Sequence, residues 1–178
     1  MPLHEMFSPE EMELLQLRAQ RVAAPLQEKD KAGHLTALVA IMRGEKYALP
    51  IDAITVVYQN VDIIPVPCVP DFVAGIANVR GHLVSVLDLA AFLGLDSYDH
   101  TGGATLVVAR AGDASIGFVV EAIGEVIELP MSQINFVSAN MNLDQADSIQ
   151  GIFPDGSVLL NMKAVLEDPR LVIDESIN

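Results

Sequence analysis

Residues 65–89 read PVPCVPDFVAGIANVRGHLVSVLDL, and this stretch decides the fold class. Its first part is broken by prolines. Its second part holds two apolar runs, 75–79 and 83–87, separated by Arg80-Gly81. Short apolar runs on either side of a two-residue turn that contains glycine are typical of a β-hairpin. The stretch therefore predicts two antiparallel strands joined at Arg80.

The same pattern occurs three more times along the chain. Strand pairs are predicted at 37–42 with 46–49, at 105–109 with 115–120, and at 149–153 with 157–160, each across a glycine-containing turn. Short helical pieces are predicted after Asp88 and after Asn161, whose side chains can cap a helix. Many short strands at this spacing, without βαβ units, indicate a mainly β protein built as small barrels or a sandwich.

Two internal similarities suggest that the β part is repeated. Residues 47–57 resemble residues 116–126, with Asp52-Ala53-Ile54 matching Glu121-Ala122-Ile123. Residues 87–93 resemble residues 160–166, each combining a strand end, a capping Asp or Asn and a helical turn. The two pairs come in the same order along the chain. They predict two similar β subdomains, the second echoing the first.

Residues 1–34 differ from the rest and predict an added N-terminal helix followed by a linker. Ser8, Pro9 and Glu11 form a helix start with a capping box. Apolar residues at helical spacing then form one narrow face: Met12, Leu15, Ala19 and Val22. Such a helix can pack on its own domain or serve as a partner-binding arm. We expect the remainder to divide into a β domain at 35–170 and a C-terminal tail at 171–178.

Composition excludes several classes of protein. Ten Lys and Arg stand against 24 Asp and Glu, giving a net charge of −14, so the chain would repel nucleic acid. The single cysteine rules out an internal disulfide and a cysteine-based zinc site, and the histidines lack metal-site spacing. No apolar run approaches the ~20 residues of a membrane span, and the acidic N-terminus does not fit a secretory signal. We therefore expect a cytoplasmic protein without membrane insertion.

Catalytic motifs are missing from the sequence. There is no phosphate-binding glycine loop, metalloprotease motif or nucleophile elbow. The nearest approach to a catalytic triad is His82, Ser85 and Asp88, but alternation along a strand places His82 and Ser85 on opposite faces. Asp88 is better explained as a helix cap. The sequence predicts a non-enzymatic interaction module without a cofactor or metal.

The stretch 65–89 also resembles the signature segment of CheW-like domains. It contains the P-V-P, the P-x-F-x-x-G, the N-[LV]-R-G turn and the V-x-V-[IL]-D-L strand end of that family. Segments 47–54, 117–127 and 151–166 resemble the family in the right order, so the resemblance covers about 35–168. It implies two intertwined five-stranded SH3-like β-barrels. It also implies an adaptor that couples methyl-accepting chemoreceptors, at their cytoplasmic tip, to the regulatory domain of the histidine kinase CheA.

The resemblance suggests which residues contact these partners. Receptor-facing candidates are Ile54, Val57, Val79, Arg80 and Val84. Kinase-facing candidates are Val61, Ile63 and Val66 in the first barrel, and Val119, Ile123 and Val126 in the second. For each Val and Ile, ordinary packing in the core is an equally open interpretation. Such residues would serve an interface only where they are exposed.

Two positions depart from the family pattern. Val56 stands where the family usually has a Glu that pairs with the arginine of the N-[LV]-R-G turn, and Ala90 stands where an Arg is common. Arg80 must then find another contact, such as Asp88, Asp71 or an acid on a partner. These departures leave open a divergent protein of a non-standard chemosensory or two-component pathway, or a decoy that inhibits. A small-molecule-binding β-barrel is a less favoured alternative.

Overall fold

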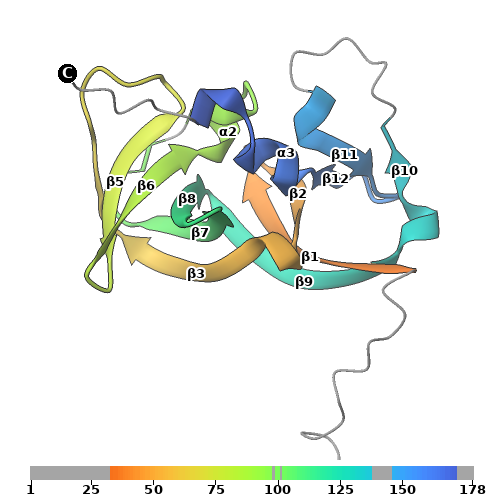
Figure 1. Ribbon diagram of the computed structural model, residues 1–178. Coiled ribbons are helices and arrows are strands. Elements are labelled where there is room, and N and C mark those ends of the chain that lie inside the picture. Colours follow the sequence, from red (N-terminus) through yellow and green to blue (C-terminus); the bar gives the residue numbers. More distant parts are fainter. Residues whose placement is uncertain (1–32, 98, 101, 138–145, 172–178) are drawn as a thin grey trace, which may run out of the picture. The chain divides into compact units, whose positions relative to one another are not determined.

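The computed structural model describes residues 33–97, 99–100, 102–137 and 146–171. The helix predicted within residues 1–34, and the tail from residue 172 onward, lie outside these residues. The elements described below belong to one compact unit, residues 35–178. Only the first residue of the first strand, His34, falls before this unit. Figure 1 shows the described part of this unit as a β structure with short helices between strands. The prediction of a mainly β protein is confirmed.

The described part of the chain forms two six-stranded sheets. The first sheet has the order β10-β11-β12-β2-β1-β9 and the second has the order β3-β7-β8-β6-β5-β4. The strands of the first sheet are β1 (His34–Met42), β2 (Glu45–Pro50), β9 (Ala122–Pro130), β10 (Asn135–Phe136), β11 (Ile149–Ile152) and β12 (Val158–Leu160). The strands of the second sheet are β3 (Ile54–Val61), β4 (Ile63–Ile64), β5 (Val73–Val79), β6 (His82–Asp88), β7 (Ala104–Ala111) and β8 (Ala114–Val120).

Short helices connect the strands. Among the described residues, α-helices follow β6 and β12, as predicted: α2 (Leu89–Phe92) and α3 (Met162–Leu166). The 3-10 turns are η2 (Ile51–Ala53), η3 (Met131–Gln133), η4 (Ala146–Ser148) and η5 (Pro169–Leu171). The Asp88 carboxylate accepts the Ala91 N–H at 3.1 Å, and the Asn161 amide oxygen accepts the Ala164 N–H at 3.2 Å. Both predicted helix caps are confirmed.

The two sheets repeat one arrangement. Each has five longer strands and one two-residue strand, β4 or β10, and their strand orders correspond one to one. The first internal similarity, between residues 47–57 and 116–126, covers the two crossovers between sheets, from β2 to β3 and from β8 to β9. The second marks β6 with α2 and β12 with α3. The sheets are intertwined because the β1–β2 hairpin lies beside the C-terminal strands, with β2 parallel to β12. Among the described residues, each hydrogen-bonded ladder stays open at its edge strands.

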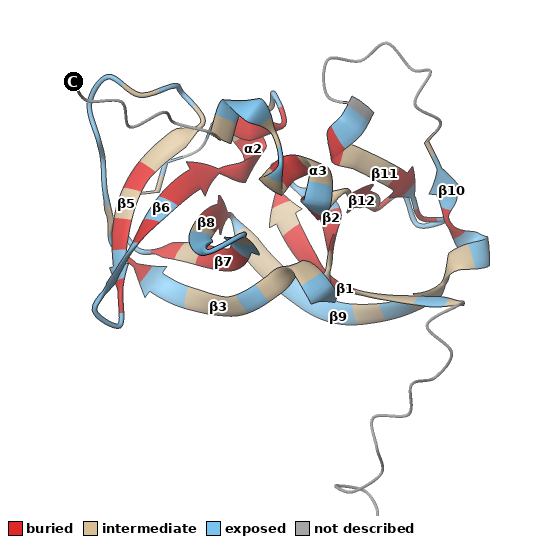
Figure 2. Cartoon of the chain, viewed as in Figure 1, coloured by how far each residue is buried: buried red, intermediate tan, exposed pale blue. Residues whose placement is uncertain are grey.

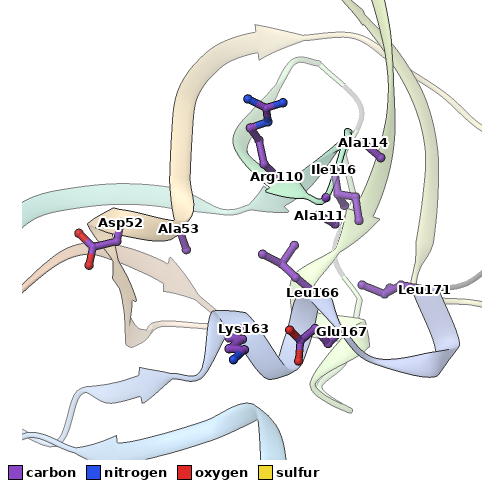
Figure 3. A pocket seen from close by; sticks show the side chains of 11 residues that line it. Asp52, Ala53, Arg110, Ala111, Ala114, Ile116, Lys163, Leu166, Glu167 and Leu171 are labelled. Carbon is purple, nitrogen blue, oxygen red and sulfur yellow. The ribbon is translucent and has the colours of Figure 1, made fainter.

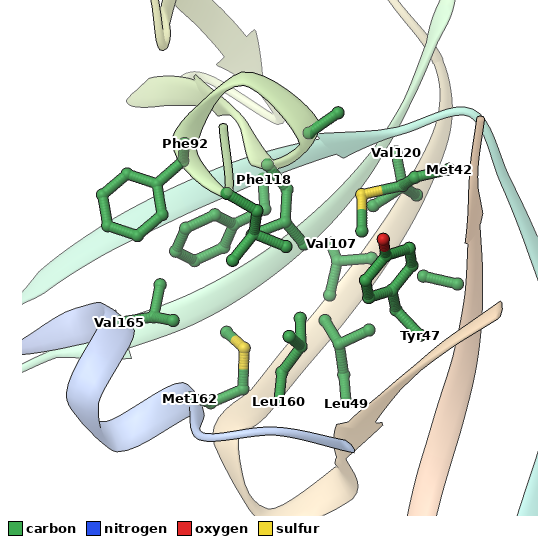
Figure 4. Close-up of a cluster of buried hydrophobic side chains, with 14 of the residues drawn as sticks. Met42, Tyr47, Leu49, Phe92, Val107, Phe118, Val120, Leu160, Met162 and Val165 are labelled. Atoms are coloured by element: carbon green, nitrogen blue, oxygen red, sulfur yellow. The ribbon is translucent and has the colours of Figure 1, made fainter. Parts of the chain in front are cut away.

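The apolar core of the described residues has three parts, and Figure 2 marks the buried stretches of the strands and helices. A central cluster draws side chains from both sheets and both helices, including Leu49, Phe92, Phe118, Leu160 and Met162 (Figure 4). A second-sheet cluster contains Val61, Ala77, Val79, Val84, Val86, Ala104, Leu106, Val108 and Val119. A first-sheet cluster contains Ala37, Ala48, Ile134, Phe153 and Leu159. Each sheet therefore buries one face in its own cluster and contributes to the shared central one.

Arg170 joins the C-terminal turn η5 to aromatic rings of the central cluster. Its guanidinium lies 4.1 Å from the ring centroid of Phe92 and 5.7 Å from that of Phe72, and the two rings meet edge to face at 5.5 Å. Nη2 of Arg170 also forms an ion pair with Asp168 at 2.8 Å. Hydrogen bonds from Arg170 lower the pKa of the Asp168 carboxyl. Both cation–π contacts and the ion pair therefore depend on this one side chain.

We expect Arg170→Ala to lower the free energy of unfolding by about 1 kcal/mol at neutral pH, the usual scale for an exposed cation–π contact plus a surface ion pair. A second variant, Asp168→Asn, isolates the ion pair. Because the folded-state pKa of Asp168 lies below the ordinary 3.8, its stabilisation is complete above that value and is lost as the pH falls through the lower folded value. Urea unfolding from neutral to acidic pH should show the deficit of Asp168→Asn shrinking at low pH. A deficit independent of pH would contradict this.

Candidate partner-binding surface

The β5–β6 hairpin presents Arg80 at its tip. Val79 pairs with His82, which leaves Arg80 and Gly81 as a two-residue turn with φ values of 52° and 85°. Positive φ at both central positions defines a type I′ turn, which matches the natural twist of a hairpin. The Asn78 side-chain oxygen accepts the Gly81 N–H at 3.0 Å and closes the turn. The local sequence Asn78-Val79-Arg80-Gly81 thus fixes an exposed cation at the end of the hairpin.

Arg80 contacts an aromatic ring in place of the carboxylate that the family usually provides. Its guanidinium lies 5.6 Å from the ring centroid of Tyr58 on β3. Val56, two residues earlier on the same strand, packs against the second-sheet cluster. Asp88, one acid considered as a partner for Arg80, is instead 1% exposed and lies 3.1 Å from His100 Nε2. The expectation of an Asp88 contact is therefore wrong.

A second exposed feature lies on the outer face of β4, β5 and β6, which we call the β4–β6 face: Ile64, Ile76 and Leu83. Ile64 pairs with Ile76, Ile76 with Ser85, and Leu83 with Asn78, so strand alternation places all of these on one side. Leu83 is 72% exposed and Ile64 is 58% exposed. Val66, also exposed, follows shortly after β4. Large apolar side chains gathered in this way on a surface are typical of an interaction site.

The structure separates the receptor-facing candidates by depth. Arg80 is exposed, whereas Ile54 and Val57 are partly buried against the central cluster. Val79 and Val84 are buried members of the second-sheet cluster. They lie on the inward side of the hairpin, opposite the β4–β6 face. The receptor prediction therefore depends on Ile54, Val57 and Arg80.

The kinase-facing candidates divide in the same way. Val61 and Val119 are buried in the second-sheet cluster, and Ile63 packs against it. Ile123 is partly buried against the central cluster. Val66 is exposed, and Val126 on β9 is 56% exposed. Val66 follows β4 of the second sheet and Val126 lies on β9 of the first sheet, so these six residues do not form one described patch.

Sequence reasoning missed Leu83 and Ile64, the two most exposed large apolar side chains in the described residues. A usable signal was present for Leu83. In the run His82-Leu83-Val84-Ser85-Val86, alternation groups Leu83 with the polar Ser85 and groups Val84 with Val86. An apolar residue on the polar side of a strand is the residue to suspect of binding.

The remaining chemistry of the described part is sparse. Among the described residues, no group of three or more His, Cys, Asp or Glu side chains is placed to hold a metal ion. No helix in the described part has both the length and the apolar character needed to cross a bilayer.

Comparison with known proteins places this geometry in a family context. A family model described as the CheW-like domain matches residues 36–170. Chemotaxis protein CheW of Thermotoga maritima is 33% identical over 93 residues, which span 52% of this chain and 61% of that protein. Chemotaxis protein CheW of Bacillus subtilis is 26% identical over 125 residues, which span 70% of this chain and 80% of that protein. Chemotaxis protein CheW of Helicobacter pylori is 25% identical over 150 residues, which span 84% of this chain and 90% of that protein.

A solved structure shares the fold. It is the crystal structure of scaffolding protein TtCheW from Thermoanaerobacter tengcongensis, which superposes with a TM-score of 0.61. The match has 24% sequence identity and covers 71% of this chain and 86% of that chain. At this identity the likeness establishes the two-sheet architecture.

Proposed function

Because this chain belongs to the family of CheW-like domains, we propose that it is a non-enzymatic scaffold coupling methyl-accepting chemoreceptors to a CheA-type histidine kinase. The family match covers residues 36–170, and the relatives are named as chemotaxis proteins. Its partners accordingly belong to chemotaxis signalling. A protein that joins a receptor to a kinase needs two separate binding surfaces, and its place is at membrane-anchored receptor arrays in the cytoplasm.

The observation that carries this proposal is the β4–β6 face. Leu83 and Ile64 are exposed to water although the same strands bury Val84 and Val86 on their other side. Apolar side chains that stay in water add no free energy of burial to the isolated domain. We infer that they contribute by being buried in a complex. A patch of this kind suits a transient signalling interface, which is small.

We assign the two partners to two neighbouring surfaces of the β5–β6 hairpin, its outer face and its turn. The regulatory domain of the kinase is proposed to contact the β4–β6 face together with Val66, and Ile63 supports β4 from beneath. The receptor tip is proposed to contact the turn with Arg80, along with Ile54 and Val57. A central arginine is a common anchor of protein interfaces. The two surfaces predict that binding of either partner can be weakened alone.

Leu83→Ser tests the kinase surface. Full burial of a leucine contributes about 1.5–3 kcal/mol, so we expect affinity for the regulatory domain to fall by about tenfold to a hundredfold. The matched control is Ile152→Ser, because Ile152 is also exposed but lies on β11 of the other sheet. Calorimetric titration should show weaker binding for the first variant alone, with unchanged urea unfolding for both. Equal kinase affinity of the Leu83 variant and the unmodified chain would contradict the assignment.

A decoy that occupies the kinase without activating it is the second candidate. The observation that favours it is the Arg80–Tyr58 contact, which stands where the family usually pairs arginine with glutamate. Kinase autophosphorylation, measured with receptor fragments and increasing amounts of this protein, separates the two functions. A scaffold stimulates the kinase, whereas a decoy binds with similar affinity and lowers its activity.

A further inference from the structure

A pocket of about 620 Å³ lies apart from the β4–β6 face and from the Arg80 turn, and its wall at Ala53 adjoins Ile54. Its walls come from the β7–β8 turn, the β2–β3 crossover at η2, helix α3 and turn η5 (Figure 3). The volume falls within the roughly 300–1,000 Å³ that is usual for ligand pockets. Ile116, Leu166 and Leu171 line it and also pack against the central cluster. The apolar lining is thus continuous with the core.

The repeated architecture shows why this space is open. The β1–β2 hairpin closes with the pair Met42–Glu45, and the β7–β8 hairpin closes with Ala111–Ala114. Two residues further from each turn, Ala40 pairs with Tyr47 in the first hairpin and Ala109 pairs with Ile116 in the second. Tyr47 of β2 therefore corresponds to Ile116 of β8. The repeat therefore relates Met42 to Ala111 and Tyr47 to Ile116.

In the first sheet these positions are filled by large side chains. Met42 is 0% exposed and Tyr47 is 6% exposed, and both belong to the central cluster (Figure 4). In the second sheet the smaller Ala111 and Ile116 remain partly exposed and line the pocket. One half of the repeat thus supplies an aromatic ring and a methionine where the other half supplies a methyl group and an isoleucine. The pocket lies where that bulk is missing.

The rim restricts the chemistry of what can fill it. Two acids, Asp52 and Glu167, and one base, Lys163, line the pocket, whereas Arg110 pairs with Ser115 and directs its side chain to the other side of the sheet (Figure 3). An anion in the pocket would be repelled by the two carboxylates and a cation by Lys163, whereas a neutral hydroxyl can donate to a carboxylate or accept from the lysine. Tyr47 shows this combination in the first sheet, because its ring is buried while its hydroxyl donates to Glu45 at 3.3 Å.

We propose that this pocket receives a tyrosine side chain of a partner protein. The ring would replace the bulk that Tyr47 supplies in the other half, and the hydroxyl would reach the charged rim. Tyrosine is frequent among the anchors of protein interfaces because it joins a large apolar surface to one polar group. The proposal concerns a third surface and does not depend on the assignments of receptor and kinase.

The first test uses p-cresol, the side-chain analogue of tyrosine, added to the isotope-labelled full chain and followed by amide NMR. We expect saturable shifts at Gly112, Ile116 and Leu166, and smaller shifts with toluene, which lacks the hydroxyl. The peptide acetyl-Gly-Tyr-Gly-amide should produce shifts at the same amides. Amide shifts of equal size at Leu83 and Ile64 would overturn the site. An absence of amide shifts on addition of the peptide would overturn the assignment to a protein partner.

Filling the pocket from within is the second test. Ala111→Met combined with Ile116→Tyr copies the first sheet and should abolish the p-cresol shifts while raising the melting temperature. The control Ser115→Tyr adds a ring on the other side of β8 and should leave the shifts intact. If the double variant does not fold, Ala111→Met alone should weaken p-cresol binding severalfold. Undiminished binding in a folded, filled variant would overturn the proposal.

A third variant ends the chain at Leu171, the last lining residue, and asks whether residues 172–178 compete for the same pocket. Unchanged affinity for p-cresol is expected. An increase in affinity on removal of these residues would mean that the chain fills its own pocket, and would overturn the assignment to a partner.

Discussion

Gly75→Ala is expected to destabilise the protein more than any other single methyl addition proposed for this chain. Gly75 has a φ of +143°, a backbone conformation that L side chains rarely adopt. An added Cβ would overlap the Ile64 carbonyl oxygen and lie 2.8 Å from the carbonyl carbon. Because both groups belong to backbone, neither can rotate away. We expect a loss of about 3 kcal/mol or more from combined strain and overpacking, a large part of the ~5–15 kcal/mol of a typical domain.

Gly112→Ala separates the two causes. Gly112 also has a positive φ, +62°, but nothing lies within 4 Å of the added Cβ. It should lose only the conformational part, about 1 kcal/mol. Urea unfolding followed by circular dichroism compares the two midpoints. Equal midpoints would show that the close approach of β4 to β5 relaxes freely, and would remove the physical reason for the glycine of the P-x-F-x-x-G motif.

The local elements of this fold could be predicted from sequence because their determinants are local. The Arg80-Gly81 turn closes through Asn78, three residues from the glycine, and the caps at Asp88 and Asn161 each span three residues. Hydrogen bonds over so short a distance depend on the residue types at a few neighbouring positions. All four predicted hairpins are confirmed for that reason.

The pairing of hairpins into sheets was beyond the sequence pattern. The β1–β2 hairpin pairs with β12 and β9, which lie far along the chain, and both parallel contacts, β2 with β12 and β6 with β8, join non-consecutive strands. Alternation along a strand specifies which side is apolar but not which strand becomes its neighbour. The family resemblance, and not periodicity, supplied the intertwined topology.

The candidate site shows a different limit. Val79 and Val84 match the family by motif, yet both face the second-sheet cluster, and the exposed apolar residue of that hairpin is Leu83. A shift of one residue along a strand exchanges the core side for the solvent side. The Arg80–Tyr58 contact joins β3 to the β5–β6 turn across the sheet, so it depends on tertiary structure that no local motif encodes.

Arg80→Glu is expected to weaken binding of the receptor tip by about tenfold or more, because a cation at an interface becomes an anion that its partner acid repels. The chain should stay folded. Arg80 is exposed, and its contact with Tyr58 contributes only about 0.5–1 kcal/mol at such a site. Binding to the kinase regulatory domain should change little, since the variant leaves Leu83 and Ile64 in place.

Lys46→Glu is the matched control, because it changes the net charge by the same amount at an exposed position of β2 in the other sheet. If long-range repulsion were the cause, both variants would lose receptor affinity alike, and salt would restore both, since exposed charges are screened within about 8 Å at physiological ionic strength. If Arg80 is an anchor, only its variant loses affinity, and salt restores little. Loss of the folded circular dichroism signal in Arg80→Glu would instead identify the Arg80–Tyr58 contact as structural. The pattern across receptor, kinase and salt therefore distinguishes an anchoring arginine from a general charge effect and from a packing role.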